Sequence, residues 1–368
     1  MKYFDYAATT PVDTEVLDTY VQVSHNFFGN TSSLHKLGRE SNYMYEVAKK
    51  TIEDTLQLAH HDLIFTSNAT EANNLAILGI AKKCTGGKII TTKIEHPSVY
   101  NPIQSLEKDF EVKYLDVDEM GQISTDQLEK EMTTDTLLVS IMWVNNIVGT
   151  IQNIKRVIEI VKKYPRCKLH VDAVQGMCKI VPDFDFNDID LFTFSTHKIY
   201  GPKGIGVLCK KSTIELSKLL YGSSVQYGAK PGTFDVALIA ATAKAIKKFY
   251  PLTYQHSQYV KALWTELYNG IKDNKNIEIN TPIKGISYYI MNISIVGVKG
   301  ETVLHKLEAA EICISTGSAC SSKVKKPEKT VYAMTKSTQR AFDSVRISLS
   351  HLVKQTEMAD LIKILREL

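Results

Sequence analysis

The N-terminal half of the chain alternates short β-branched or apolar runs with amphipathic helical windows. The pattern predicts strands at Leu63–Thr66, Lys88–Thr92, Glu111–Leu115, Leu137–Met142, Lys168–Val171 and Leu191–Phe194. Between them it predicts helices at Glu71–Lys83, Ser98–Lys108, Thr125–Glu131 and Ile154–Tyr164. Alternation at this spacing is typical of a mostly parallel α/β sheet. The stretch Leu137–Ile141 is apolar almost throughout, as expected of a strand buried between two helical layers.

The rhythm of the sequence changes beyond about residue 235. Two long helical windows, Val236–Tyr250 and Thr253–Lys272, precede a mixed region with strands near Tyr288–Ile295 and Ser344–Leu349. We interpret this region as a second, smaller α+β domain with its boundary near Pro251. The length of 368 residues agrees with this division, since domains average about 150 residues.

Composition excludes several classes of protein. Lys and Arg number 44 and Asp and Glu number 40, so the net charge of +4 is too small to predict binding to nucleic acid or to an anionic membrane. No apolar run approaches the roughly 18 residues of a membrane span, and the N-terminus lacks the apolar segment of a signal peptide. The six cysteines show no C-x-x-C pairing, so we expect reduced thiols in a cytoplasmic protein and no metal site.

Polar residues follow several predicted strands, at the edge where parallel α/β sheets bind ligands. The segment Thr66–Ala72 is rich in helix-capping residues and would suit a phosphate, although an ordinary N-cap is the alternative. Asp172 follows one apolar strand, where it could also be a helix cap. Lys198 lies between another strand and the turn Gly201–Gly204, where a lysine can lose its proton and form an imine.

An anion cradle, an acid and a lysine at neighbouring strand ends match the three needs of pyridoxal 5′-phosphate (PLP): a phosphate anchor, a partner for the pyridinium nitrogen and an imine link. His96 follows a further strand and could stack on such a cofactor, or could be a hydrogen-bonded turn residue. The chain contains no G-x-x-x-x-G-K-[ST] motif, and the glycines of Gly201–Gly206 do not fit a dinucleotide fingerprint.

Six segments, taken in order, resemble the cysteine desulfurases, which are PLP enzymes of the class V aminotransferase group. They are Tyr3–Pro11, Phe65–Glu71, Glu95–His96, Val144–Asn146, His170–Ala173 and His197–Gly204. The segment Ser315–Ser322 is similar to the catalytic-cysteine loop of the NifS/IscS branch. The resemblance covers about residues 3 to 350. It implies the type I (aspartate aminotransferase-like) fold of PLP-dependent transferases, with a mostly parallel, seven-stranded α/β/α domain at residues 15–250. A smaller α+β domain at residues 1–14 and 251–368 would carry the cysteine loop at about residues 315–330.

The resemblance also implies roles for residues around the cofactor. Lys198 would form the imine and shuttle protons, Asp172 would pair with the pyridinium nitrogen, and Gln175 would hydrogen-bond the phenolic oxygen. His96 would stack on the ring and serve in acid–base steps. The remaining expected contacts hold the phosphate and come from Ala69, Thr70, Ser195, His197 and, from a second subunit of a homodimer, Thr233.

Asn146 and Arg346 match the positions that bind the carboxylate of the substrate L-cysteine in this family. A guanidinium fork suits a carboxylate because it makes two parallel hydrogen bonds, whereas a surface ion pair is the alternative for an isolated arginine. Cys320 lies among small, polar residues typical of a mobile loop, and the resemblance implies that its thiolate attacks the sulfur of bound cysteine, leaving a persulfide and releasing alanine.

The resemblance implies that the persulfide sulfur passes to an acceptor protein, such as an iron–sulfur scaffold or a tRNA-thiolating enzyme. Four lysines follow Cys320 and could steer an acidic acceptor, or could serve solubility alone: Lys323, Lys325, Lys326 and Lys329. Alternatives to a desulfurase are an aminotransferase or lyase of the same fold, and a sulfur-relay or scaffold protein with weakened catalysis. Departures from the family pattern lie at Thr31, Asn68, Ile147, Ser223–Gln226 and Lys230–Pro231, and those near Gln226 and Lys230 motivate the last of these alternatives.

Overall fold

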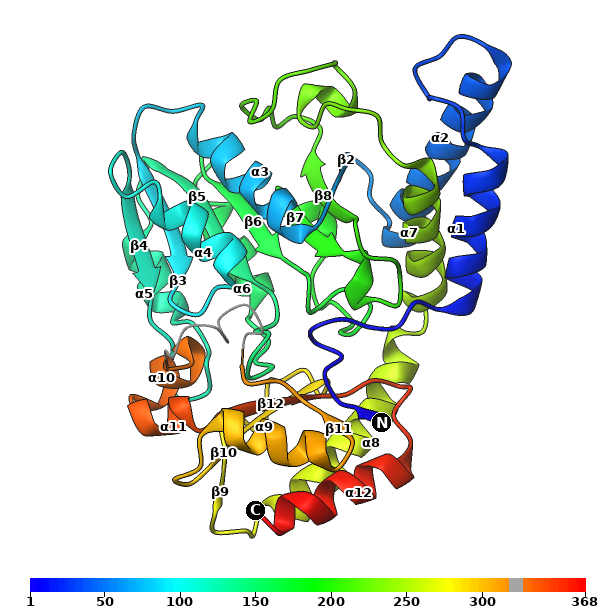
Figure 1. Cartoon of the computed structure of the whole chain (residues 1–368). Helices are drawn as coiled ribbons and strands as arrows, with labels where there is room; N and C mark the ends of the chain where they lie inside the picture. The colour runs from blue at the N-terminus through cyan, green and yellow to red at the C-terminus, as the bar shows by residue number, and fades with distance from the viewer. Residues whose placement is uncertain (318–326) are drawn as a thin grey trace.

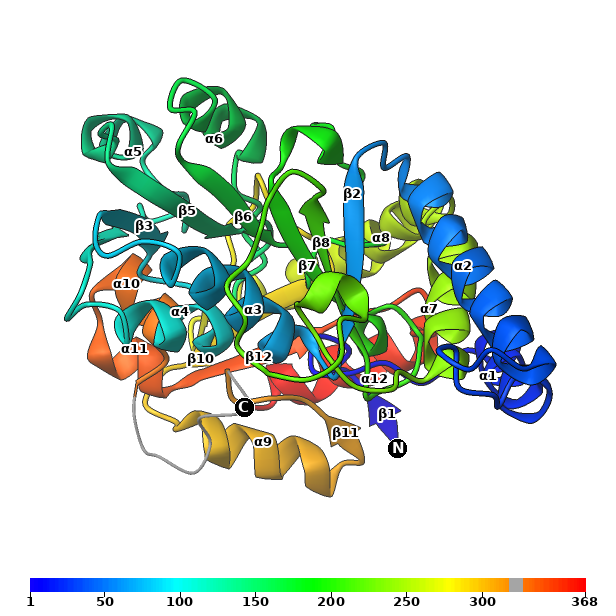
Figure 2. The same cartoon turned by 90° about the horizontal axis from the view of Figure 1, so that it is seen from above.

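The computed structural model describes residues 1–317 and 327–368 of the chain. Within them, seven strands form one large sheet in the order β2-β8-β7-β6-β5-β3-β4 (Figures 1 and 2). Neighbouring strands are parallel, except that β8 pairs antiparallel with both β2 and β7. In sheet order the bounds are His61–Thr66, Gly206–Lys211, Leu191–Ser195, Lys168–Asp172, Thr136–Met142, Lys88–Thr92 and Glu111–Leu115. The predicted mostly parallel sheet is confirmed.

Helices cover both faces of the large sheet (Figure 2). Leu63 and Phe65 of β2 point into one core, and Ile64 between them points into the other, as the alternation of side chains along a strand requires. The first core is covered by α1 (Thr14–Asn26), α2 (Lys36–Leu56), α5 (Thr125–Glu131), α6 (Ile154–Val161) and α7 (Val236–Phe249). The second core is covered by α3 (Ala69–Ala81) and α4 (Pro97–Gln104).

A smaller antiparallel sheet has the strand order β12-β10-β9 and a hydrophobic core of its own. Its strands are Ser344–Ser348, Ile290–Ile295 and Ile277–Ile279, and its helices are α8 (Thr253–Ile271), α9 (Gly300–Ala309) and α12 (Gln355–Arg366). The chain start joins this unit, because β1 (Lys2–Tyr3) pairs with β11 (Ile312–Cys313). The separate cores support, as a proposal, the division into residues 15–250 and residues 1–14 with 251–368.

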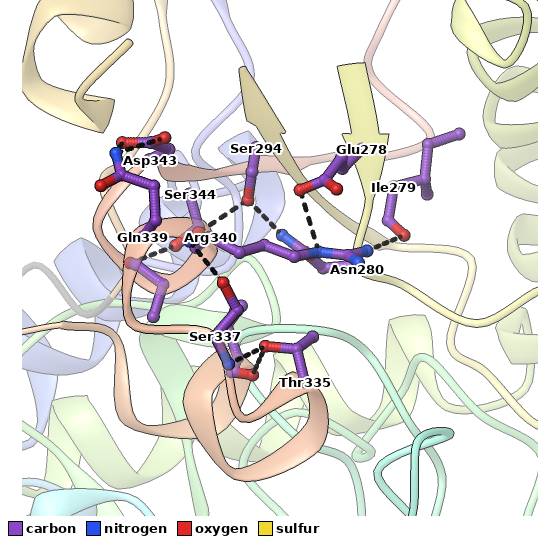
Figure 3. A network of polar contacts seen from close by, with 12 residues as sticks. Glu278, Ile279, Asn280, Ser294, Thr335, Ser337, Gln339, Arg340, Asp343 and Ser344 are labelled. Carbon is purple, nitrogen blue, oxygen red and sulfur yellow. Dashed lines mark hydrogen bonds and ion pairs between the residues drawn. The ribbon is translucent and has the colours of Figure 1, made fainter. Parts of the chain in front are cut away.

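The short helices α10 (Lys329–Thr335) and α11 (Thr338–Phe342) are tied to the small sheet by a polar network centred on Arg340 (Figure 3). The Arg340 guanidinium donates to the Ile279 carbonyl at 2.9 Å and to the side chain of Asn280. In return, the Ser294 hydroxyl donates to the Arg340 carbonyl at 2.8 Å. The chain that follows residue 326 is therefore fixed to β9 and β10.

The strands Lys88–Thr92 and Glu111–Leu115 and the helix Thr125–Glu131 have their predicted bounds. The predicted helix at Ile154–Tyr164 ends earlier, at Val161, where the chain turns ahead of Pro165, which disfavours helical backbone in the residue before it. The sequence patterns assigned no element to α1, α2 or β8. Among the described residues, no helix is both long and apolar enough to cross a membrane.

Gly206, the first residue of β8, packs directly against the chain that enters α3. A methyl group at this position would lie 2.3 Å from the Asn68 carbonyl carbon and 2.6 Å from the Ala69 nitrogen. We expect Gly206→Ala to lower the free energy of unfolding in urea by about 1–3 kcal/mol, because backbone atoms cannot move aside cheaply. Gly86→Ala is the control, since its methyl group would meet its nearest atom at 3.7 Å. Equal effects of the two substitutions would contradict this packing argument.

Candidate active site

A cavity of about 270 Å³ opens at the carboxyl edge of the large sheet, and β12 of the small sheet contributes to its wall. Most of the site residues predicted from the sequence line this one cavity. They are Ala69, Thr70, His96, Asn146, Asp172, Gln175, Ser195, His197, Lys198 and Arg346. Residues that are up to 277 positions apart in the chain, from Ala69 to Arg346, thus share one site.

The parallel arrangement of the strands explains why these residues converge. Asp172 and Ser195 are the last residues of β6 and β7, His96 follows the end of β3, and Ala69 follows the end of β2. Because parallel strands end at the same edge of the sheet, their following residues gather there.

The N-terminus of α3 forms one wall of the cavity at Asn68, Ala69 and Thr70. The Asn68 side chain caps the helix by accepting from the Glu71 amide at 2.9 Å, and the backbone of Asn68 is extended, with φ −173°. An asparagine is therefore tolerated where the family usually has glycine. The first N–H groups of a helix have no partner within the helix and attract anions.

His197 lies next to this helix end and is neutral at physiological pH. Burial, together with the charges of Lys198, Lys179 and Lys203, lowers its pKa to about 4. Its Nδ1 lies 3.1 Å from the Thr9 hydroxyl. A neutral imidazole here can share a hydrogen bond with an anion without adding a positive charge.

Lys198 follows β7 in a short 3₁₀ turn, with its amine at the cavity wall. Its Nζ donates to the carbonyl oxygens of Ala7 and Ala8 at 2.7 and 2.6 Å. These carbonyls belong to the N-terminal segment, which also lines the cavity and holds the amine in place.

Asp172 is 6% exposed, and no ion pair involves its carboxylate among the described residues. The Asn73 amide donates to Oδ2 at 2.9 Å and the Val174 backbone amide donates to Oδ1 at 3.0 Å. Burial raises the pKa of Asp172, and the Val174 hydrogen bond and the nearby His96 oppose this rise. A buried carboxylate in this setting fits a cationic group of a ligand, such as the pyridinium nitrogen of PLP.

Gln175 contacts a buried lysine that the sequence analysis did not single out. Lys179 is 4% exposed, and its Nζ donates to Gln175 Oε1 at 2.9 Å. The Gln175 Nε2 donates to the Ala7 carbonyl at 2.9 Å. Burial, together with the charges of Lys198 and Arg346, lowers the pKa of Lys179 to about 7. Lys179 thus fixes which end of the Gln175 amide is the donor at the cavity.

Arg346 is 3% exposed and joins three segments of the chain. Its guanidinium donates to the Asn146 carbonyl and to the Asp5 carboxylate, both at 2.9 Å. Its buried Nε has no partner among the described residues. The guanidinium is thus held at the cavity wall with Asn146 beside it, as binding of a carboxylate would require.

One predicted site residue among the described residues does not line this cavity. Thr233 is exposed in the loop before α7 and does not line the cavity. Cys320 lies outside the described residues, as do Lys323, Lys325 and Lys326. Lys329, the last member of the predicted basic patch, lies with its Nζ 3.0 Å from the centre of the Tyr100 ring, and burial lowers its pKa to about 8.

Sequence reasoning also missed Glu95, Asn73 and Ser98, all of which are buried. The Glu95 carboxylate accepts from the Thr92 hydroxyl and the Met142 amide, both at 2.9 Å, and burial raises its pKa to about 8. A signal for Asn73 was present in the sequence, because an asparagine within the otherwise apolar face of a predicted helix needs a buried partner.

Comparisons with known proteins agree with this geometry. The model of the aminotransferase class-V family matches residues 2–361. A "NifS/IcsS protein homolog" of Lactobacillus delbrueckii subsp. bulgaricus is 39% identical and covers 95% of this chain and 92% of its own length. The "putative cysteine desulfurase IscS 1" of Bacillus subtilis is 35% identical, with 97% and 96% covered.

Solved structures with the same fold include a "NIFS-like protein", with a TM-score of 0.92 and 32% identity, which covers 100% of this chain and 98% of that one. A structure described as "SspA in complex with cysteine" has a TM-score of 0.82 and 32% identity and covers 95% and 99%.

The lowered pKa of Lys179 predicts a pH-dependent stability. Between about pH 7 and pH 10 the unfolded chain holds a proton on this amine that the folded chain lacks, so stability rises with pH by up to about 1.4 kcal/mol per pH unit. We expect Lys179→Met to lose this pH dependence. Over this pH range, its free energy of unfolding should therefore exceed that of the wild type by the largest amount near pH 7. Urea unfolding over this pH range measures the difference. The surface substitution Lys82→Met should keep the wild-type pH dependence of the free energy of unfolding. If Lys179→Met kept that same pH dependence, the lowered pKa of Lys179 would be refuted.

Proposed function

We infer that this chain, which belongs to the aminotransferase class-V family, is a cysteine desulfurase of the NifS/IscS type. One observation carries the inference beyond the comparisons. A helix N-terminus, a buried carboxylate, a lysine and an arginine line one cavity at the carboxyl edge of the sheet. The overall reaction converts L-cysteine and an enzyme thiol into L-alanine and an enzyme persulfide.

We propose that the cavity holds PLP. The N-terminus of α3 with Ser195 and His197 would bind its phosphate, Lys198 would bind it covalently, and Asp172 would pair with its ring nitrogen. When bound, PLP withdraws electrons from the α-carbon of an amino acid and so weakens bonds around it. The Gln175 Nε2 would donate to the phenolic oxygen, because Lys179 occupies the other end of the amide.

Binding of the substrate carboxylate is assigned to Arg346 and Asn146. Asp5 accepts from a terminal nitrogen of Arg346 at 2.9 Å and neutralises part of its charge, and the guanidinium, which lines the cavity, would bind the carboxylate. With the carboxylate anchored there, the Lys198 amine, which lines the same cavity, would take and return the α-proton.

Cys320 is proposed as the acceptor of the sulfur atom. Its thiolate attacks the substrate sulfur, a sulfur–sulfur bond forms, the carbon–sulfur bond of cysteine breaks, and a proton replaces sulfur on the carbon to give alanine. Since a free thiol has a pKa of about 8.5, the attacking thiol must first be deprotonated by its surroundings. The persulfide would then serve an acceptor protein, such as an iron–sulfur scaffold or a tRNA-thiolating enzyme.

We also propose that the enzyme is a homodimer with shared sites. Thr233 is exposed and outside the cavity, so it could reach a phosphate only in a second copy of the chain. Large apolar side chains are exposed in the loop between α1 and α2, on α2 and in the segment leading to Thr233, as a subunit interface would require. Among them are Phe28, Leu34, Tyr43 and Tyr221.

The function is tested with purified protein and L-cysteine. We expect equal amounts of alanine and sulfide in the presence of a reducing thiol, and an added sulfur atom on the Cys320 peptide by mass spectrometry. Cys320→Ala should lose both products while cysteine still changes the absorbance of the bound cofactor, because the groups that line the cavity remain. Cys84→Ala is the control and should leave both products unchanged. Near-normal alanine formation by Cys320→Ala would refute this role, and exchange with keto acids would favour an aminotransferase.

Shared sites predict complementation between two inactive subunits. Lys198→Ala removes the covalent link, and Thr233→Asp places a negative charge beside the phosphate of the other subunit. In a heterodimer of the two variants, one site carries both defects and the other carries neither. We therefore expect the purified heterodimer to regain about half of the wild-type rate, whereas each variant homodimer stays inactive. A heterodimer as inactive as its parents would show that Thr233 does not act across the interface.

A further inference from the structure

A buried hydrogen-bond network lies directly behind the cavity and connects Asp172 to His96. Its centre is Asn73 of α3, which is fully buried. The Asn73 Nδ2 lies 2.9 Å from Asp172 Oδ2 and 2.9 Å from the Ser98 hydroxyl, and the Thr193 hydroxyl contacts Asn73 Oδ1. The Ser98 hydroxyl in turn lies 2.8 Å from His96 Nδ1. The network thus joins two groups that the proposed function places against the same cofactor.

The chemistry of the end groups sets the direction of these hydrogen bonds. A carboxylate accepts and does not donate, so the amino group of Asn73 must face Asp172. The second hydrogen of that amino group is then donated to the Ser98 oxygen. The hydroxyl hydrogen of Ser98 is left to be donated to His96 Nδ1.

A backbone contact reaches the same conclusion independently. The Ser98 backbone amide donates to His96 Nδ1 at 3.1 Å, because His96 is the N-cap of α4. A backbone N–H can only donate, so Nδ1 must present its lone pair. In a neutral imidazole the ring proton is then on Nε2.

We propose that Asn73 and Ser98 are positioning residues that hold His96 as the Nε2–H tautomer, so that His96 acts as a neutral hydrogen-bond donor and stacking surface. This inference rests on the proposed function and changes one expectation from the sequence, in which His96 serves in acid–base steps. A base needs an available lone pair. The lone pair of Nδ1 is occupied by two donors and Nε2 has none to offer, so proton transfer falls to Lys198.

The charged groups around His96 do not favour its protonation. Burial, with the charges of Lys198 and Arg346, lowers its pKa, and Asp172 alone of these neighbours raises it. The adjacent Glu95 directs its carboxylate to Thr92 and the Met142 amide rather than to the imidazole. Burial, Lys198 on η2 (Thr196–Lys198) and Arg346 on β12 therefore favour the neutral ring together with the α4 cap, and Asp172 on β6 opposes them.

The tautomer can be measured directly by NMR of the PLP-loaded protein with ¹⁵N-labelled histidine. The His96 signals are those missing from His96→Gln. We expect a proton on Nε2 and none on Nδ1 between about pH 6 and pH 8. A proton on Nδ1, or a doubly protonated ring in this range, would overturn the proposal. The measurement needs no turnover. A protein that forms no alanine from cysteine would refute the desulfurase function and leave the tautomer assignment standing.

Variants at Ser98 test the network itself. Ser98→Ala removes one of the two donors to Nδ1 and should raise the His96 pKa by about 0.5–1 pH unit, with the same shift in the acidic limb of the kcat profile. Ser98→Thr retains the hydroxyl and should restore the wild-type values. Ser105→Ala, at the other end of α4, is the matched control and should change neither. A Ser98→Ala protein with an unchanged His96 pKa would show that the hydroxyl does not hold the ring. Asn73→Leu should shift the His96 pKa in the same direction as Ser98→Ala, because the Ser98 hydroxyl then loses the hydrogen bond that Asn73 donates to it.

Discussion

The burial of the Asp172 carboxylate at the end of a central strand is the constraint on which the site depends. A charge in such a position is costly unless donors surround it, and the structure supplies the Asn73 amide and the Val174 backbone N–H. Asn73 reaches the carboxylate because α3 packs across β6 and β7, which in turn requires the apolar face of that helix. The positive charge of Arg346 at the cavity wall is also balanced, since Arg346 is paired with Asp5 of the N-terminal segment. The packing of α3 on the sheet and the stabilisation of the buried Asp172 carboxylate therefore depend on the same residue, Asn73.

Arg346 extends this coupling to the small sheet. Its side chain contacts Asn146 and Asp5, and its backbone exchanges two hydrogen bonds with Ser315, at 2.7 and 3.1 Å. The start of the chain, β12 and the last described residues before position 318 are thus joined at one residue. Arg340 fixes the chain on the other side of that segment to β9 and β10. Both attachment points of the segment that contains Cys320 are consequently set by the small sheet.

The sequence predicted well what depends on local periodicity and on strand ends. The strands of the parallel sheet and the residues that follow them, such as Asp172 and Lys198, were identified because an apolar run ending in a polar residue is a local signal. The sequence analysis did not predict α1, α2 or β8, because these elements are buried by contacts with residues that are distant in the sequence. The sequence analysis also missed Lys179. In the sequence this lysine, four residues beyond Gln175, cannot be distinguished from an exposed lysine, and only the structure shows that it is buried.

The departures from the family pattern are compensated by contacts of the substituting residues. Ile147 replaces a usual glutamate and is 2% exposed, packed with Val331 and Met334 of α10, so an apolar contact holds that helix against the large sheet. Gln226 belongs to the stretch Ser223–Gln226, which replaces a glycine-rich, glutamate-containing stretch of the family, and its side chain contacts β2, an edge strand. Its amide accepts from the Phe65 N–H at 2.6 Å and donates to the Phe65 carbonyl at 3.1 Å.

A carboxylate at position 226 could satisfy only the first of these two backbone groups, whereas an amide satisfies both and pairs with β2 as another strand would. Lys230, four residues later, lies 3.4 Å from Glu71 in the first turn of α3. The segment that carries Thr233 is therefore attached to both ends of the turn that leads from β2 into α3. These contacts argue against a weakened scaffold, because Gln226 and Lys230 still hold the chain that enters α3, whose N-terminus forms one wall of the cavity.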